Sequence, residues 1–198
     1  MPNRGHHEDM RLPDLTPAEL TDDQRALHDR IASGPRAAGP QHFPLVDPSG
    51  ALTGPFGVMI HEPALGAPLQ ELGSAVRYRT ELPDRVREIA ILAVAAATDC
   101  AFELYAHARV GRAAGLDGDE LAALDEARFS SSDPVEEAAY GFCRRLLDGR
   151  SRLTDTEYDE LRTTLGTRTI TELVVLVGYY RTLAQLLDVY DVGVPAVQ

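Results

Sequence analysis

The sequence predicts an all-α fold of about seven to eight helices. Apolar residues recur at steps of three and four along most segments, which is the period of an α-helix. Strict alternation of apolar and polar residues, which is typical of a half-buried strand, is not sustained. Most of these segments also open with Asp, Thr or Pro and several close with Gly, as helices commonly do.

The composition is typical of one soluble globular domain and argues against nucleic acid as a partner. The chain has 198 residues, 44% hydrophobic and 25% charged, with a net charge of -12. Binding to phosphates needs clustered cations, which an excess of carboxylates opposes. No run of about 18 apolar residues and no apolar signal region is found, so we expect a cytoplasmic protein that contacts no membrane. Cys100 and Cys143 are therefore expected to be free thiols.

The chain is expected to form a flexible tail over residues 1–15 and a single domain over residues 16–198. The tail contains His6, His7, Glu8 and Asp9, which could chelate a metal ion, but a solvated polar tail is the preferred interpretation. Residues 33–57 hold five prolines and five glycines, so a long loop is expected there. Loops of this length are often lids or binding surfaces.

The first helix is expected to begin with Thr16 as its N-cap and Pro17 in its first turn, and to end at Gly34 and Pro35. A wide apolar stripe along the last helix indicates a core or a subunit interface. The remaining helices are expected at 63–80, 83–100, 100–115, 117–127, 133–149, 154–166 and 167–192.

One stretch, "TDCAFELYAH", carries the chemistry. On a helix Cys100, Glu103 and His107 would share one face within about 60 degrees. The spacing of four lets the Glu103 carboxylate approach the His107 imidazole, which would favour imidazolium and make a general acid/base pair. By spacing alone such a pair is more often exposed or structural, and a lone cysteine is most often a small core residue.

Glu88 is a second candidate carboxylate, twelve positions before Cys100. Its helix face is otherwise apolar, so the side chain would be partly buried and could carry a proton. Arg85 or Arg87 could instead pair with it.

Three further residues are candidates for binding a substrate: Phe56 in the long loop, His61 just after it, and Tyr180 in the last helix. Surface or turn positions for His61 and a core position for Tyr180 are the alternatives. The patterns GxGxxG, P-loop and HExxH do not occur, so no cofactor and no metal are expected.

The segment "REIAILAVAAATDCAFELYAHARVGRAAGL" resembles the core motif of the carboxymuconolactone decarboxylase-like family, which includes the alkylhydroperoxidase AhpD-like proteins. A weaker likeness extends over nearly the whole chain. The resemblance implies an AhpD-like helical domain that assembles into a homo-oligomer, a dimer, trimer or hexamer, with sites near subunit contacts.

The two branches of that family imply different chemistry. The peroxidase branch uses a Cys-x-x-Cys pair, and here Glu88, Cys100 and His107 match its pattern while Glu103 replaces the second cysteine. A dithiol cycle needs two sulfurs that can approach each other. The decarboxylase branch is similar in having a glutamate and a histidine at the spacing of Glu103 and His107.

Three hypotheses follow. The leading one is a cofactor-free decarboxylase, lyase or isomerase acting by proton transfer on a lactone or a keto/enol acid, with His107 as acid or base and Glu103 as its orienting group. The second is a thiol-dependent peroxidase that uses Cys100. The third is an oligomeric protein that binds a small molecule without transforming it.

Overall fold

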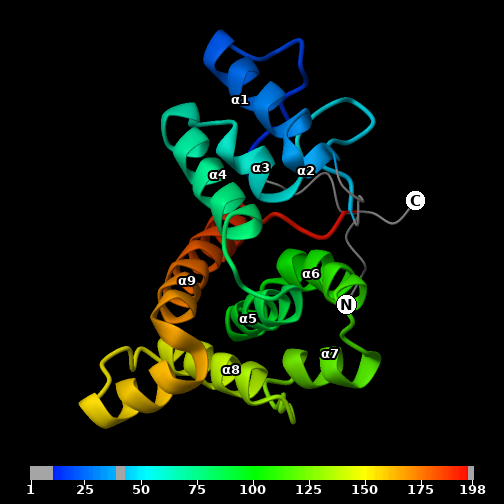
Figure 1. Cartoon of the computed structure of the whole chain (residues 1–198). Coiled ribbons are helices and arrows are strands. Elements are labelled where there is room, and N and C mark those ends of the chain that lie inside the picture. The colour runs from blue at the N-terminus through cyan, green and yellow to red at the C-terminus, as the bar shows by residue number, and fades with distance from the viewer. Residues whose placement is uncertain (1–10, 39–42, 196–198) are drawn as a thin grey trace. The chain divides into compact units, whose positions relative to one another are not determined.

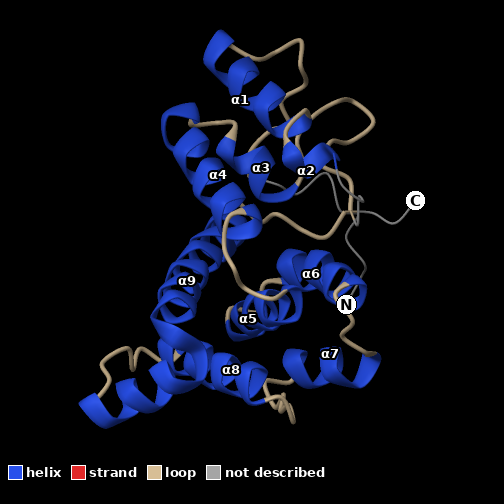
Figure 2. Ribbon diagram, viewed as in Figure 1, coloured by secondary structure: helices blue, strands red, loops and turns tan. Residues whose placement is uncertain are grey.

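A computed structural model of the protein describes residues 11–38 and 43–195. These ranges consist of helices joined by loops (Figure 2), with one isolated antiparallel bridge between Val46 and Leu52. The prediction of an all-α fold is confirmed. The described helices are α1 (Asp22–Ala32), α2 (Pro35–Ala38), α3 (Gly54–Met59), α4 (Pro63–Tyr78), α5 (Asp84–Ala97), α6 (Ala101–Ala113), α7 (Gly118–Asp125), α8 (Pro134–Leu147) and α9 (Asp155–Val189).

The chain divides into two compact units, each taken here by itself. The first comprises the described residues of Met1–Tyr78 and Gln185–Gln198, in which α4 packs against α1 and α3. The second comprises Arg79–Ala184, in which α5 contacts α6, α7 and α8 (Figure 1). The single domain expected over 16–198 stays a prediction.

The expected start of the first helix was wrong. Thr16 does not cap a helix. Its backbone N–H and its hydroxyl both donate to the Glu19 carboxylate and close a turn. The helix begins at Asp22, because Thr21 and Gln24 form a reciprocal capping box. Its end at Ala32, just before Gly34, agrees with the prediction.

The Pro/Gly-rich stretch has more local order than a plain loop. Its described residues include the single turn of α2 and the beginning of α3 at Gly54, and the Val46–Leu52 bridge closes a turn between them. The Asp47 carboxylate fixes that turn by accepting hydrogen bonds from the backbone of Ser49 and Ala51. Residues 39–42 lie outside the described ranges.

Of the tail expected over 1–15, only residues 11–15 are described. The Arg11 guanidinium and backbone N–H donate to the carbonyls of Val189 and Tyr190 in the same unit. His6, His7, Glu8 and Asp9, and with them the choice between a chelating and a solvated tail, lie outside the described residues.

Helix α5 is the centre of the second unit. Apart from its first turn it is buried on almost every side, which is the pattern of a core helix rather than of an amphipathic surface helix. The buried positions are Val86, Glu88, Ile89, Ala90, Ile91, Leu92, Ala93, Val94 and Ala95. A carboxylate, Glu88, is therefore held fully buried among apolar residues of α5.

Arg85 ties three helices of the second unit together. Its guanidinium donates to both oxygens of Glu136 on α8, at 2.6 and 3.1 Å, and to Glu120 on α7 at 2.7 Å. It also donates to the carbonyl of Gly115. The arginine lowers the pKa of both carboxyl groups by hydrogen bonding to their ionised forms.

Helix α9 joins the two helices expected at 154–166 and 167–192. Gly166 lies between them with φ 77° and ψ 157°, a conformation that glycine adopts without strain, and it kinks the helix. By length and composition α9 could cross a membrane, with a mean hydropathy of 1.2 over 18 residues, but half of that stretch is buried inside the protein. Leu173 and Leu176 are fully buried, as in a core helix.

Candidate active site

A short connection places α5 and α6 next to each other. Helix α5 ends at Ala97 and α6 begins at Ala101, and the turn between them contains Asp99 with φ 51°. The hydroxyl of Thr98 donates to the carbonyl of Val94 and so satisfies the end of α5. Since α5 and α6 pack together, positions that are far apart in sequence meet across this contact.

The imidazole of His107 lies between two carboxylates. Its Nδ1 is 2.7 Å from Oε2 of Glu88 on α5, a short hydrogen bond between residues 19 positions apart. Its Nε2 is 3.3 Å from Oε2 of Glu103, one turn earlier on α6. The histidine side chain is 6% exposed and the glutamates 0% and 5%, so all three groups are shielded from water.

This arrangement keeps His107 protonated at neutral pH. Burial by itself lowers the pKa of the imidazole, because it disfavours the charged form. The charge of Glu88, together with hydrogen bonds to both carboxylates, outweighs that effect and raises the pKa from 6.5 to about 9. Both ring nitrogens then carry protons and face acceptors.

Tyr180 from α9 closes a third side of the imidazole. The two rings are perpendicular with centroids 5.2 Å apart, and Tyr179 packs edge-on against Tyr180 in turn. Tyr180 is 5% exposed, which agrees with the alternative of a core position, and its ring also contacts the candidate catalytic histidine. Its predicted role in binding a substrate stays a prediction.

Cys100 does not share the helical face of Glu103 and His107. Its φ of −84° and ψ of 94° are extended, and it is the N-cap residue of α6 rather than part of the helix. The side chain is 7% exposed. Cys143 is fully buried in α8, where burial raises the pKa of its thiol to about 12. Among the described residues neither cysteine forms a disulfide, in line with the expectation of thiols.

Phe56 and His61 belong to the first unit, whereas the histidine site belongs to the second. Phe56 is 3% exposed and packs under the Arg36 guanidinium, 5.0 Å from the ring centroid. His61 pairs through Nε2 with the carbonyl of Pro13 at 3.0 Å. Their place near a substrate stays a prediction.

Arg87 is the residue near this site to which sequence reasoning assigned no role beyond a possible pairing. Its Nε lies 3.6 Å from Oε1 of Glu88, while Arg85 is engaged by Glu136 and Glu120. Of the two arginines that could pair with Glu88, the structure places Arg87 beside it. The available signal was that Arg87 and Glu88 are adjacent in sequence. Adjacency could not show in which direction the Arg87 side chain points.

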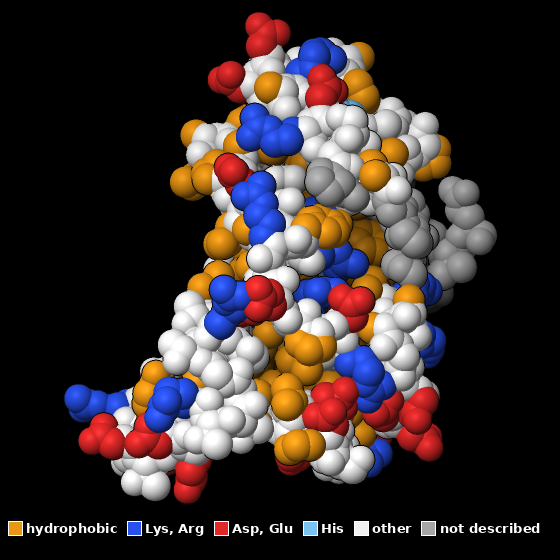
Figure 3. Space-filling model, in the orientation of Figure 1, with side chains coloured by type: hydrophobic (Ala, Val, Ile, Leu, Met, Phe, Trp, Pro, Cys, Tyr) orange, Lys and Arg blue, Asp and Glu red, His pale blue; other side chains and the backbone are white. Residues whose placement is uncertain are grey.

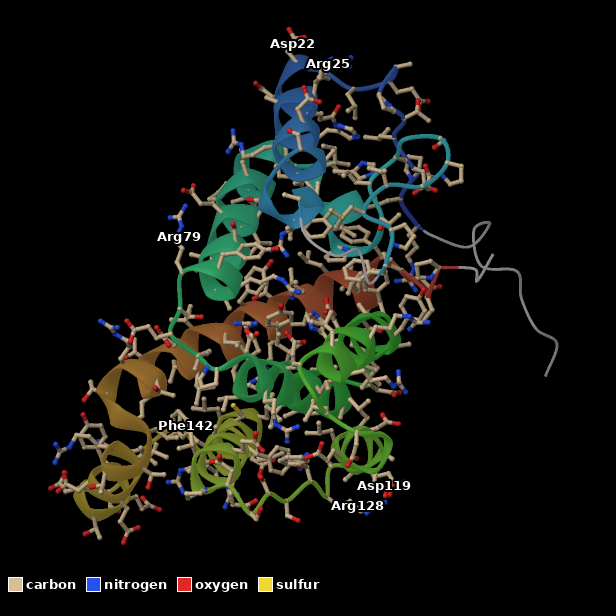
Figure 4. The ribbon with its side chains drawn as sticks, turned by 45° about the vertical axis from the view of Figure 1, so that its right-hand side comes forward. Asp22, Arg25, Arg79, Asp119, Arg128 and Phe142 are labelled. Atoms are coloured by element: carbon tan, nitrogen blue, oxygen red, sulfur yellow. The ribbon has the colours of Figure 1, made fainter. Side chains whose placement is uncertain are left out.

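A surface hollow of about 290 Å³ also lies in the second unit, between α8 and the first part of α9. Phe142 lines it (Figure 4), with Arg145 and Glu157, which form an ion pair at 3.1 Å. None of the predicted site residues contributes to this hollow.

Over the described residues, no group of three or more His, Cys, Asp or Glu side chains is placed to hold a metal ion. On the visible face, arginine side chains lie next to Asp and Glu side chains (Figure 3).

Comparison with known structures identifies the fold. An alkylhydroperoxidase AhpD core protein from Ralstonia eutropha, described as an uncharacterized peroxidase-related protein, is similar with a TM-score of 0.74 and 15% identity, over 96% of this chain and 94% of that one. The debrominase Bmp8 gives a TM-score of 0.67 at 15% identity, over 92% and 91%. An AhpD-type protein of unknown function from Agrobacterium tumefaciens gives 0.60 at 18%, over 69% and 94%. The TM-scores show a shared fold.

No curated protein matches the sequence. Residues 63–144 match the model of the carboxymuconolactone decarboxylase family, a segment that runs from the start of α4 into α8. It contains Glu88, Cys100, Glu103 and His107. This segment is therefore similar to the carboxymuconolactone decarboxylase family, and the chain has the fold of the AhpD-like proteins.

Proposed function

We propose that the protein is a cofactor-free enzyme that transfers protons on a lactone or a keto/enol acid, in a decarboxylation or a related lyase or isomerase step. One observation carries the proposal: the buried imidazole of His107 has a carboxylate at each ring nitrogen. Buried histidines with perturbed pKa values and specific charged partners are typical of proton-transfer sites.

In a decarboxylation, the bond between the carboxylate and the adjacent carbon breaks and carbon dioxide leaves. The electron pair of that bond passes into the neighbouring carbonyl or enone and gives an enolate. His107 donates its Nε2 proton to the enolate carbon, and water then returns a proton to the imidazole. The imidazolium also stabilises the enolate before protonation, because opposite charges attract strongly in a water-poor site.

The two carboxylates have different positions and therefore different roles in this proposal. Glu88 accepts the short bond from Nδ1 and fixes the ring, so the proton on Nδ1 is the one held more tightly. Glu103 is 3.3 Å from Nε2, a longer contact that an incoming substrate can replace. Glu103 is then close enough to the reacting atoms to accept a proton in an isomerase step. The earlier assignment of Glu103 as the orienting group passes to Glu88.

The test uses His107→Gln, which keeps a polar side chain between the carboxylates. A panel of lactones and keto/enol acids is incubated in D₂O, and carbon dioxide release and deuterium at carbon are measured. For the substrate that the wild type turns over, we expect a loss of about 100-fold or more. His28→Gln is the control, because His28 pairs with the carbonyl of Gly50 in the first unit. Equal turnover by His107→Gln and the wild type would contradict the proposal.

A second candidate is a thiol-dependent peroxidase, favoured by the position of Cys100 at the N-cap of α6. A helix N-terminus favours a thiolate. The sulfur would attack the peroxide oxygen, the O–O bond would break to give a sulfenic acid and an alcohol, and two electrons from an external thiol would restore the cysteine. Cys143, with its pKa of about 12, remains a neutral thiol at neutral pH.

Peroxide treatment followed by mass spectrometry tests this candidate. Oxidation of Cys100 well before Cys143 supports it, and equal or slower oxidation of Cys100 excludes it. A ligand that binds unchanged, with His107 dispensable, would instead indicate a binding protein without catalysis.

The proposal also includes a small-molecule substrate, a homo-oligomer and a cytoplasmic location, with neither nucleic acid nor membrane as a partner. Val174 and Val175 support self-association, since these neighbouring side chains of α9 are 46% and 40% exposed. Light scattering on the purified chain measures the oligomer directly.

A further inference from the structure

Charged side chains of alternating sign form a series that includes the imidazole of His107. Asp84 pairs with the Nη2 of Arg87, the Nε of Arg87 lies 3.6 Å from Oε1 of Glu88, and Oε2 of Glu88 bonds His107 at 2.7 Å. Glu103 completes the series at 3.3 Å from Nε2 of the histidine. Five side chains from two helices thus run carboxylate, guanidinium, carboxylate, imidazole, carboxylate.

This series of charged side chains leads from the surface into the core. Asp84 is 74% exposed, Arg87 12% and Glu88 0%. The Nε of Arg87 is buried and makes no hydrogen bond in the described part of the chain. Asp84 therefore holds the outer end of the guanidinium by an ion pair. The inner edge of the guanidinium interacts with the Glu88 carboxylate through charge.

Glu88 and His107 compete for one proton. A carboxylate buried without compensation takes up a proton, and the pair would then be a neutral acid beside a neutral imidazole. A positive charge on the far side of the carboxylate opposes that state and favours the ion pair. Arginine does not give up its own proton, so Arg87 acts through its charge and not as a route for protons.

We propose that Arg87 is a positioning residue that keeps Glu88 ionised and thereby keeps the proton on His107, where the reaction uses it. The inference rests on the proposed proton-transfer function and adds the group that decides where the proton sits. Arg87 touches Glu88 and not the reacting atoms.

Other charged and titratable groups also face the pair. Glu103 from α6 and Tyr180 from α9 contact the imidazole directly. Helices α7 and α8, which also pack on α5, bring Glu120 and Glu136, and both carboxylates are bound by Arg85. Arg87 is thus a cation that the structure places beside Glu88.

The test is Arg87→Gln in the full chain, with the Glu88 side-chain carbonyl and the His107 ring followed by NMR over a pH titration. We expect the pH at which Glu88 takes up a proton to rise by about one unit or more. The midpoint of the acid limb of the kcat–pH profile should move to higher pH by a similar amount, while KM changes little. Arg87→Lys keeps the charge and should restore most of both. Arg112→Gln removes a positive charge from an exposed position on α6 and should leave both unchanged.

A folded Arg87→Gln variant in which Glu88 and the acid limb behave as in Arg112→Gln would overturn the inference. If Arg87→Gln does not fold, Asp84→Asn decides. Asp84 is exposed, so water screens its own charge, and its removal releases the guanidinium. A smaller upward shift supports the inference and no shift overturns it. The NMR titration needs no substrate, so it tests the role of Arg87 separately from turnover. If the shift is observed but the protein turns over no lactone or keto/enol acid, the proposed function is refuted and the role of Arg87 stands.

Discussion

Oε2 of Glu88 lies 2.7 Å from Nδ1 of His107, although the two residues are 19 positions apart on different helices. The contact fixes the imidazole ring, determines which nitrogen is more available, and keeps the ring charged inside an apolar helix pair. Each of these consequences can be measured.

The stability of the protein should depend on pH through His107. Its pKa is raised in the folded chain from 6.5 to about 9, so folding is favoured most where the imidazole is protonated in both states, below pH 6.5. The free energy of unfolding should then fall by about 3 kcal/mol as the pH rises from 6.5 through 9. Urea unfolding at pH 6, 7.5 and 9 measures the decline.

His107→Gln supplies the control for that slope, because glutamine does not titrate. Over the same pH window its unfolding free energy should decline far less than that of the wild type. Parallel slopes in the two proteins would show that His107 is not the group responsible.

Arg85→Met should destabilise the protein by about 2 kcal/mol. The change leaves Glu136, which is 7% exposed, without its bidentate partner, while the 30% exposure of Arg85 reduces the cost relative to a fully buried pair. Arg128→Met is the matched control, since Arg128 pairs with Glu126 at the surface beside α7 (Figure 4) and should give no measurable change. Equal effects of the two variants in urea unfolding would refute the role of Arg85 as a link between helices.

Two helical glycines should respond in opposite directions to alanine. At Gly111 in α6 an added Cβ would lie 3.0 Å from Leu116 and 3.3 Å from Leu121, so Gly111→Ala should destabilise by about 1 kcal/mol. At Gly141 in α8 the added Cβ meets nothing within 4 Å, so Gly141→Ala should stabilise by up to about 1 kcal/mol. Thermal unfolding compares them, and a stabilising Gly111→Ala would show that the α6–α7 contact is looser than described.

Helical periodicity predicted the fold class and most helix positions, because burial of one face leaves a repeat of three and four in the sequence. Local signals also set several ends, such as the end of α1 before Gly34. The start of α1 was misplaced because Thr16 and Glu19 form a hydrogen-bonded turn that resembles a capping box in sequence. The kink at Gly166 was visible only as the boundary between two expected helices.

For the site, spacing within one helix predicted that Glu103 approaches His107, since residues four apart share a face. Spacing could not show that Glu88 makes the shorter contact, because that depends on how α5 packs against α6. Nor could it show that Cys100 precedes the helix, which places its side chain outside the face shared by Glu103 and His107. Tertiary packing made both differences.

The central claim, that His107 is a buried imidazolium held by Glu88, is tested most directly by ¹⁵N NMR of the histidine ring. At pH 7.5 both ring nitrogens of His107 should be protonated, and the ring should titrate near pH 9. In Glu88→Gln, which removes the charge on Nδ1's partner, the titration should move to lower pH. A wild-type His107 that is neutral at pH 7.5, with a titration unaffected by Glu88→Gln, would contradict the account.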